Sequence, residues 1–417
     1  MLVEFRVKNF RSIRAEQRLS LVADKDSTYE ESHLIETGNS AIPRLLKSAV
    51  VYGPNAGGKS NLINALAFMR TIVATSATQI REGQQFNCPA FKLDSKSKEQ
   101  PSEFELTFIN QGVRYQYGFS LTPERVIEEW LLVYKTAKPQ MWFSRHFNAK
   151  SGKDEYDLGS HLTGQRALWQ ESTRSNALFL SKAVDLNSER LRPIFLWIVE
   201  GLIIFGAGSQ PVFDFSVGYA QTEEGKVALL HFLNAADLSI ADMTFENKKM
   251  KQFGFHLEDG KPPLQTLTEF EAPMPIFLHQ AEEGTATFEI QDESTGTQRF
   301  FAFAGPILDV LKNGRVLIVD ELDNSLHTLM IKFLISQFHS TNNNTQGAQL
   351  IFTTHDTSLL DHEIFRRDQI WLVKKDPAQA TILYPLTDFS PRKKEALGRG
   401  YLMGRYGALP FLTDFEL

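Results

Sequence analysis

The stretch that decides the fold runs from Lys47-Ser-Ala-Val-Val-Tyr52 into Gly53-Pro-Asn-Ala-Gly-Gly-Lys-Ser60. The first six residues predict a short buried strand, and apolar residues at helical spacing from Ser60 to about Ala74 predict a helix. Between them lies the pattern Gly-x-x-x-x-Gly-Lys-Ser, in the strand–loop–helix order of a phosphate-binding P-loop. Glycines let backbone N–H groups turn inward around a phosphate, and the helix N-terminus adds positive charge. The sequence therefore predicts nucleotide binding at this loop.

Within the loop, two side chains carry specific chemistry. Lys59 can reach the β- and γ-phosphates and so serves catalysis as well as binding, and Ser60 can ligate Mg²⁺. The bland alternative is a glycine turn with a solvent-facing lysine, which the flanking strand and helix disfavour. We expect nucleotide contacts from Gly53, Pro54, Asn55, Ala56, Gly57, Gly58, Lys59 and Ser60. The cofactors that follow are ATP and Mg²⁺.

A second motif, Val316-Leu-Ile-Val-Asp320-Glu321, has four apolar residues followed by two acids. The run predicts a central strand, and Asp320 at its carboxyl end can hold Mg²⁺ through water. Glu321 stands where a carboxylate can orient or deprotonate the attacking water. The alternative is a strand that happens to end in solvent-facing acids. Because a small-molecule kinase gains nothing from activating water, the acidic pair favours a hydrolase.

Three more polar groups follow predicted elements. His355, in Thr353-Thr-His-Asp356, follows the next strand and is expected to sense the γ-phosphate, against the alternative of a surface or capping residue. Asp323 is expected to contact nucleotide, against a plain helix cap. Ser294 and Gly296 precede a predicted helix and could bind phosphate at its N-terminus, against a simple N-cap.

Strands alternating with helices predict an α/β fold with a mainly parallel sheet. The expected elements are strands at 3–10, 47–52, 316–319, 350–353, 370–373 and 382–386, helices at 60–74, 297–311 and 326–338, and a hairpin over 104–121. Residues 166–205 are expected to be mostly helical with a break near Pro193, whereas 206–275 give no clear pattern. No heptad pattern persists, so no long coiled coil is expected.

Composition narrows the class of protein. The chain has 417 residues, a net charge of −6, 42% hydrophobic residues and one cysteine, Cys88. This fits a globular protein of a reducing compartment, and no signal sequence or membrane span is apparent, so we expect a cytoplasmic protein without membrane contact.

Nine acidic residues and one basic residue fall between Glu258 and Glu293, which indicates a solvated hairpin or lid or, less favoured, a partner-selecting surface. Pro391–Tyr406 is basic, which indicates a solvated helix or, less favoured, a contact with a phosphate backbone or an acidic partner.

Taken in order, these motifs resemble the ATP-binding-cassette class of AAA-type ATPases, the branch with SMC, Rad-type, RecF and OLD-family proteins. The N-terminal Phe5-Arg-Val-Lys-Asn-Phe-Arg11-Ser12 is similar to the first strand of that class. The resemblance is greatest to RloA/AbiL-like abortive-infection and retron-type anti-phage defence ATPases, on Phe91–Asp94, Thr173–Asn176 and Gly404–Pro410. It implies an N-terminal antiparallel β portion, a parallel core and an inserted helical lid, divided at 1–160, 161–290 and 291–417.

The resemblance also implies partners. Two copies would sandwich ATP in a homodimer or higher oligomer, each nucleotide held by one P-loop and capped by Ser294 and Gly296 of the other copy. The chain would regulate a separately encoded effector, such as a nuclease or Toprim-like toxin. OLD-type nucleases carry a Toprim domain after the ATPase, and only 62 residues follow His355, so no nuclease activity is expected in this chain. The alternative is a RecF-like DNA-repair clamp that binds duplex DNA.

Overall fold

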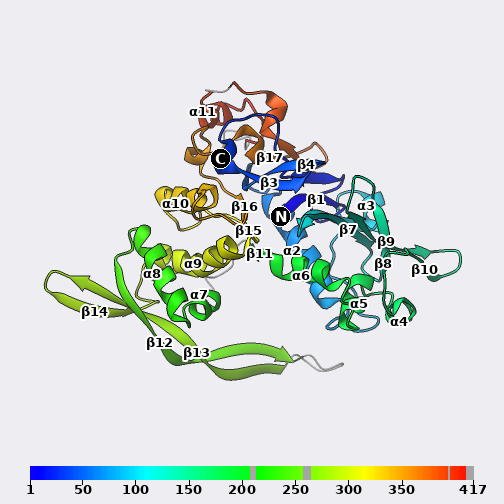
Figure 1. Ribbon diagram of the computed structural model, residues 1–417, viewed down its shortest axis with the longest axis horizontal. Coiled ribbons are helices and arrows are strands. Elements are labelled where there is room, and N and C mark those ends of the chain that lie inside the picture. The colour runs from blue at the N-terminus through cyan, green and yellow to red at the C-terminus, as the bar shows by residue number, and fades with distance from the viewer. Residues whose placement is uncertain (207–212, 257–263, 393–394, 410–417) are drawn as a thin grey trace, which may run out of the picture. The chain divides into compact units, whose positions relative to one another are not determined.

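The computed structural model describes residues 1–206, 213–256, 264–392 and 395–409 (Figure 1). Contacts divide the chain into two units, each described here by itself. The first contains Met1–Gly208, Val310–Asn324 and Ile331–Leu417, and the second contains Ser209–Asp309 and Ser325–Met330. These boundaries differ from the three-part division at residues 160 and 290 that the sequence suggests.

The centre of the first unit is a six-stranded, mainly parallel sheet (Figure 1). In spatial order its strands are β11 (Leu202–Phe205), β15 (Val316–Val319), β16 (Gln349–Thr353), β5 (Ser48–Tyr52), β17 (Ile370–Lys375) and β18 (Thr381–Pro385). The first five run parallel, and β18 is antiparallel to β17. Three of the central strands, β15, β16 and β5, are buried along their whole length, as expected for a sheet covered on both faces.

A seven-stranded antiparallel sheet makes up the N-terminal part of the first unit. Its order is β10 (Lys153–Leu158), β9 (Gln140–Asn148), β8 (Val126–Tyr134), β7 (Val113–Leu121), β6 (Ser102–Asn110), β1 (Leu2–Lys8) and β2 (Gln17–Ser20). The predicted hairpin over 104–121 is confirmed as β6 and β7. Gln111 and Gly112 both have positive φ at its turn, the conformation of a two-residue hairpin loop.

Helix α2 (Lys59–Thr75) contributes to a core that both sheets share. Its Leu62 and Met69 belong to the same buried cluster as Phe5 of the antiparallel sheet and Val51 and Ile318 of the parallel sheet. Because α2 begins at Lys59, this packing fixes the helix end that follows the P-loop.

Residues 166–205 are not one helical stretch broken at Pro193. They form α4 (Arg166–Ser172), α5 (Phe179–Asp185), α6 (Arg192–Gly201) and the edge strand β11. Pro193 lies in the first turn of α6, where its missing N–H costs no helical hydrogen bond, so the break precedes it. The β-branched Ile203 and Ile204 extend as strand beside β15.

The second unit holds a long antiparallel hairpin rather than helices alone. It contains α7 (Asp214–Tyr219), α8 (Glu223–Ala235), β12 (Ile240–His256), β13 (Leu264–Ala281) and β14 (Gly284–Glu289), together with most of α9 (Thr295–Asn313). The strand order is β12-β13-β14. As far as it is described, the acidic run from Glu258 falls on β13, β14 and the following turn, so it belongs to an inserted hairpin; residues 257–263 lie outside the described residues.

The remaining elements are α1 (Glu30–His33), β3 (Leu34–Asn39), β4 (Ile42–Leu46), α3 (Ser95–Glu99), α10 (Thr328–His339), η1 (Thr357–Leu359), η2 (Arg367–Gln369), η3 (Leu386–Phe389) and α11 (Leu397–Leu402). Gly314, with φ 62°, follows α9 as a C-terminal glycine cap. Among the described residues, no helix is both long and apolar enough to span a membrane. Lys393, Lys394 and Pro410, parts of two segments singled out in the sequence, lie outside the described residues.

Candidate functional site

The loop Gly53–Ser60 connects β5 to α2, as predicted. A Cβ on Gly53 would lie 2.5 Å from the Val373 carbonyl oxygen, and one on Gly58, whose φ is 114°, would lie 2.1 Å from Thr381 Oγ1. Both glycines are therefore required by close packing against the neighbouring strands β17 and β18. Ala56 also has a positive φ, 60°, so the loop keeps its turn at some backbone strain there.

Lys59 is buried at the start of α2, and its ammonium group donates hydrogen bonds to loop carbonyls. Its Nζ lies 2.8 Å from the Gly53 oxygen and 3.3 Å from the Pro54 oxygen. Burial lowers the pKa of Lys59 to about 8, while the negative charges of Asp320, Glu321 and Asp323 act in the opposite direction. The P-loop lysine and the acids after β15 therefore share one electrostatic site.

Asp320 lies at the carboxyl end of β15 with 2% of its surface exposed. Thr353, at the end of β16, donates its hydroxyl proton to Asp320 Oδ1. The other oxygen, Oδ2, is buried and has no hydrogen-bond partner in the described structure, and the same holds for Asp323 Oδ1. A buried carboxylate oxygen without a partner is costly, and a hydrated Mg²⁺ would satisfy it, so these residues fit the predicted metal.

Glu321 follows in a left-handed backbone conformation, with φ 53°. Its N–H donates to Thr353 Oγ1 at 2.8 Å, which holds the turn in place. One hydroxyl thus fixes both acids of the motif. Left-handed conformation is uncommon for a residue other than glycine and occurs often at functional sites.

His355 follows β16 and presents an exposed side chain. Its backbone N–H donates to Asp323 Oδ2 at 3.0 Å, which ties the loop after β16 to the loop after β15. Partial desolvation and the Lys59 charge lower the pKa of His355. The negative charges of Asp323, Glu321 and Asp320 act in the opposite direction but are outweighed. The structure therefore brings together Lys59, Asp320, Glu321, Asp323 and His355.

Three residues that support the loop were not predicted as site residues. Thr381 Oγ1 donates to the Gly57 carbonyl oxygen at 3.0 Å and lies 2.8 Å from Ser12 Oγ. Asn61 of α2 donates to Ser12 Oγ at 2.6 Å. Ser12 belongs to the N-terminal segment quoted above, which could have drawn attention to it, whereas Thr381 at the start of β18 carries no signal in the sequence.

A cavity of about 600 Å³ lies beside the P-loop. Its lining includes Ala56 of the loop, Arg11 and Ser12 from the N-terminal turn, Phe91, and Lys375 of β17. Asn9 shapes this wall, because its side chain accepts from the Phe91 N–H and donates to the carbonyls of Ser97 and Gln100. The cavity combines apolar groups with three cationic side chains, Arg11, Lys92 and Lys375, next to the phosphate loop.

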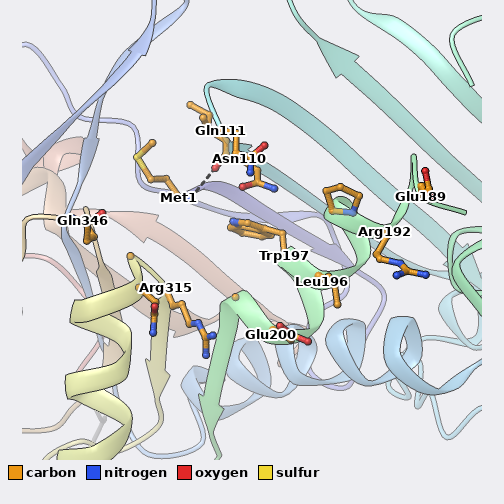
Figure 2. Close-up of a pocket in the computed structure, with 15 residues that line it drawn as sticks. Met1, Asn110, Gln111, Glu189, Arg192, Leu196, Trp197, Glu200, Arg315 and Gln346 are labelled. Carbon is orange, nitrogen blue, oxygen red and sulfur yellow. Dashed lines mark hydrogen bonds between the residues drawn. The ribbon is translucent and has the colours of Figure 1, made fainter. Parts of the chain in front are cut away.

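A second cavity, of about 550 Å³, lies at the other edge of the parallel sheet. It is lined by Leu196 and Trp197 of α6 and by Arg315, which directly precedes β15 (Figure 2). The P-loop follows the end of β5, whereas this cavity adjoins the start of a parallel strand, so it is not the nucleotide site.

Ser294 and Gly296 lie in the second unit, at the start of α9. Ser294 Oγ accepts the Thr297 N–H at 3.1 Å, so in this structure the serine is the helix N-cap that the alternative interpretation expects. A Cβ on Gly296 would approach the Ser325 carbonyl oxygen to 3.1 Å. These contacts leave open the predicted role in phosphate binding, which stays a prediction.

The chain contains one Asp-x-Asp sequence, the pattern of Toprim nucleases, at Asp24-Lys-Asp26. Asp24 pairs with Arg366 at 3.0 Å, and Asp26 pairs with Arg367 at 2.6 Å. Both carboxylates therefore serve ion pairs in the first unit.

A P-loop between a parallel strand and a helix, with the acids of the neighbouring strand beside its lysine, defines an ATPase domain of the AAA/ABC type. The family described as "AAA domain, putative AbiEii toxin, Type IV TA system" matches residues 48–361, and the chain belongs to this family.

Among solved structures, the SMC head domain from Thermotoga maritima is similar over 92% of this chain and 98% of its own, with 14% identity and a TM-score of 0.42. The SmcHead bound to the C-winged helix domain of ScpA is similar over 92% and 96%, with 13% identity and a TM-score of 0.43. Among curated proteins no relative matches the chain. The family match carries the identification.

Proposed function

We propose that the chain is a Mg²⁺-dependent ATP hydrolase that pairs with a second copy when it binds ATP and regulates a separately encoded effector in prokaryotic anti-phage defence. One observation carries the ATPase assignment: the buried Asp320 carboxylate, with one oxygen lacking a protein partner, lies in the same electrostatic site as Lys59 and Glu321. Such a group is stable in the fold only if something else satisfies it.

The residues divide the reaction between them. Lys59 donates to phosphate oxygens in place of the two loop carbonyls that it contacts here. Ser60 and Asp320 would hold Mg²⁺, which offsets negative charge on the phosphates when bound. Glu321 accepts a proton from water as the water oxygen bonds to the γ-phosphorus and the bond to the β–γ bridging oxygen breaks, giving ADP and phosphate. His355, whose pKa is lowered by partial desolvation and the Lys59 charge, donates one ring N–H to the γ-phosphate.

The cavity beside Ala56 suits the base and ribose of the nucleotide. The exposed Leu93 offers an apolar surface for a planar base, and Arg11, Lys92 and Lys375 carry positive charge that suits the phosphates. A nucleotide whose phosphates occupy the P-loop would place its ribose and base in this neighbouring cavity.

Pairing with a second copy would bring Ser294 and Gly296 of that copy onto the γ-phosphate. What supports this is their position at the N-terminus of the long helix α9, where backbone N–H groups attract anions. A homodimer follows most simply, and a higher oligomer would repeat the same contact.

The defence role is supported by the printed description of the family, which refers to a toxin of a toxin–antitoxin system. It is also supported by the resemblance to the RloA/AbiL-like and retron-type ATPases. We expect no nuclease activity, because both carboxylates of the Asp-x-Asp sequence are ion-paired. A RecF-like clamp on DNA has less support, since Arg405 of the basic C-terminal stretch pairs with Glu395.

The test is to co-express the chain with its neighbouring gene product and purify the complex with and without ATP, measuring ATP hydrolysis by the full chain. The proposal predicts hydrolysis that Lys59→Ala abolishes and co-purification that depends on ATP. Lys150→Ala, in the exposed turn between β9 and β10, is the matched control for loss of a lysine. Absence of hydrolysis by the wild-type chain, alone and with the partner, would contradict the ATPase assignment; hydrolysis without co-purification would contradict only the regulatory role.

A further inference from the structure

We propose that Tyr52 is a positioning residue for turnover: its hydroxyl holds the loop of His355 against the strand that leads into the P-loop. The inference rests on the proposed function, since it acts through the proposed role of His355. It assigns a task to a buried side chain that touches neither nucleotide phosphates nor metal in that mechanism.

Tyr52 is a buried residue that lies directly before the P-loop. It is the last residue of β5, directly before Gly53, and 1% of its surface is exposed. Its hydroxyl donates to the backbone carbonyl of Asp356 at 3.1 Å, and Asp356 directly follows His355. One side chain thus links the residue before the P-loop to the residue after His355.

Packing alone does not require the hydroxyl group of Tyr52. A phenylalanine would fill the same volume, and burying a hydroxyl is unfavourable unless it is hydrogen-bonded. Burial raises the pKa of Tyr52 well above its usual value, so the group stays protonated and acts as a donor. The hydroxyl therefore contributes a bond to the loop that a phenylalanine could not make.

Hydrogen bonds from two other elements hold the segment of His355 in place. On one side its own N–H donates to Asp323 Oδ2 at 3.0 Å, and on the other Tyr52 binds the carbonyl of Asp356. The Asp356 carboxylate accepts hydrogen bonds from the N–H and the hydroxyl of Ser358, at 2.9 and 2.6 Å. The imidazole therefore projects from a short segment anchored at both ends, once to the loop after β15 and once to β5.

The C-terminal segment backs this arrangement. The ring of Tyr401, on α11, packs against that of Tyr52 with centroids 5.9 Å apart, and the Tyr401 hydroxyl donates to the Ala408 carbonyl at 2.9 Å. The Gly398 N–H donates to the Leu360 carbonyl at 3.0 Å, at the far end of the same loop. Tyr52 is thereby held in the orientation that its hydrogen bond requires.

The test is the Tyr52→Phe variant of the full chain, measured for kcat, KM for ATP and Tm. Because a small displacement of a catalytic group is enough to slow a reaction strongly, we expect kcat to fall about tenfold, with KM and Tm nearly unchanged. In a His355→Ala background the same substitution should have no further effect, since the two act as a unit. The matched control is Tyr134→Phe, which removes a hydroxyl bonded to Gln116 at 2.9 Å in the antiparallel sheet, and it should leave kcat unchanged.

The outcomes separate the two hypotheses. If His355→Ala slows turnover but Tyr52→Phe is silent, or lowers kcat equally in both backgrounds, the positioning role is overturned and the proposed function stands. A loss of Tm and ATP affinity in proportion to kcat would show a merely structural residue and overturn it as well. If His355→Ala turns over at the wild-type rate, both the assigned role of His355 and the inference built on it fall.

Discussion

The hydroxyl of Thr353 donates its proton to the carboxylate of Asp320 and accepts the backbone N–H of Glu321. One buried side chain at the end of β16 therefore sets the orientation of both acids that follow β15. The metal ligand and the general base proposed here depend on a residue that is neither.

Replacing Thr353 with valine keeps the shape and removes this hydroxyl. We expect about 2 kcal/mol of lost stability, because the Asp320 carboxylate and the Glu321 N–H are left without their partner. ATP hydrolysis should fall about tenfold, with a raised Mg²⁺ requirement. Thermal unfolding and a Mg²⁺ titration of turnover measure the two effects; Thr353→Ser, which restores the hydroxyl, should recover most of the rate.

Gly58→Ala should abolish nucleotide binding. The added Cβ would lie 2.1 Å from Thr381 Oγ1 at a φ of 114°, so the loop must move away from the conformation that cradles phosphate. Gly38→Ala is the control, since it also has positive φ but meets nothing within 4 Å. Titration with a fluorescent ATP analogue checks this, and wild-type affinity in Gly58→Ala would contradict the structure of the loop.

Nucleotide binding should take up protons near pH 8. Burial lowers the pKa of Lys59 to about 8, so roughly half of these side chains are neutral at that pH, and a bound phosphate raises the pKa again. Near pH 7 the uptake should disappear, because Lys59 is already charged. Calorimetry of ATP binding in buffers of different ionisation enthalpy measures the proton count, and equal counts at both values of pH would refute the shift.

Stability should fall as the pH drops from about 6.5 to about 4. His33 and His339 stack with ring centroids 3.7 Å apart, and burial lowers the pKa of His33 to about 4 and that of His339 well below its usual value. Over this pH range the unfolded chain binds protons at these histidines and the folded chain does not. The free energy of unfolding therefore falls by about 3 kcal/mol for His33 alone. Tm measured from pH 7.5 to 5 should decline, and His33→Gln should flatten the decline.

The candidate site residues could be proposed from the sequence because each motif is local. Three motifs carry the signal, namely the P-loop, the strand before Asp320 and the strand before His355, and each consists of a few consecutive residues. Parallel strands then bring their carboxyl ends to one edge of the sheet. Thr381 could not be found this way: it reaches Gly57 and Ser12 only through the tertiary structure.

The strands of the β12–β13 hairpin were not located from the sequence because prolines in a strand pattern argue against a strand. Pro273 and Pro275 of β13 face β12 residues, but the pairing with β14 begins only at Ile276. At both prolines β13 thus has a neighbour on one side, which is where a strand tolerates the missing N–H. Such an edge position is set by the partner strands and not by the local sequence.

The most direct test of the account is Glu321→Gln, measured for ATP binding, turnover and mass in solution. Removing the carboxylate charge takes away the proton acceptor for water while leaving the P-loop and Asp320 in place. The account predicts ATP binding at wild-type affinity, turnover reduced at least a hundredfold, and an ATP-dependent dimer that persists. Hydrolysis by Glu321→Gln at the wild-type rate would contradict the central claim.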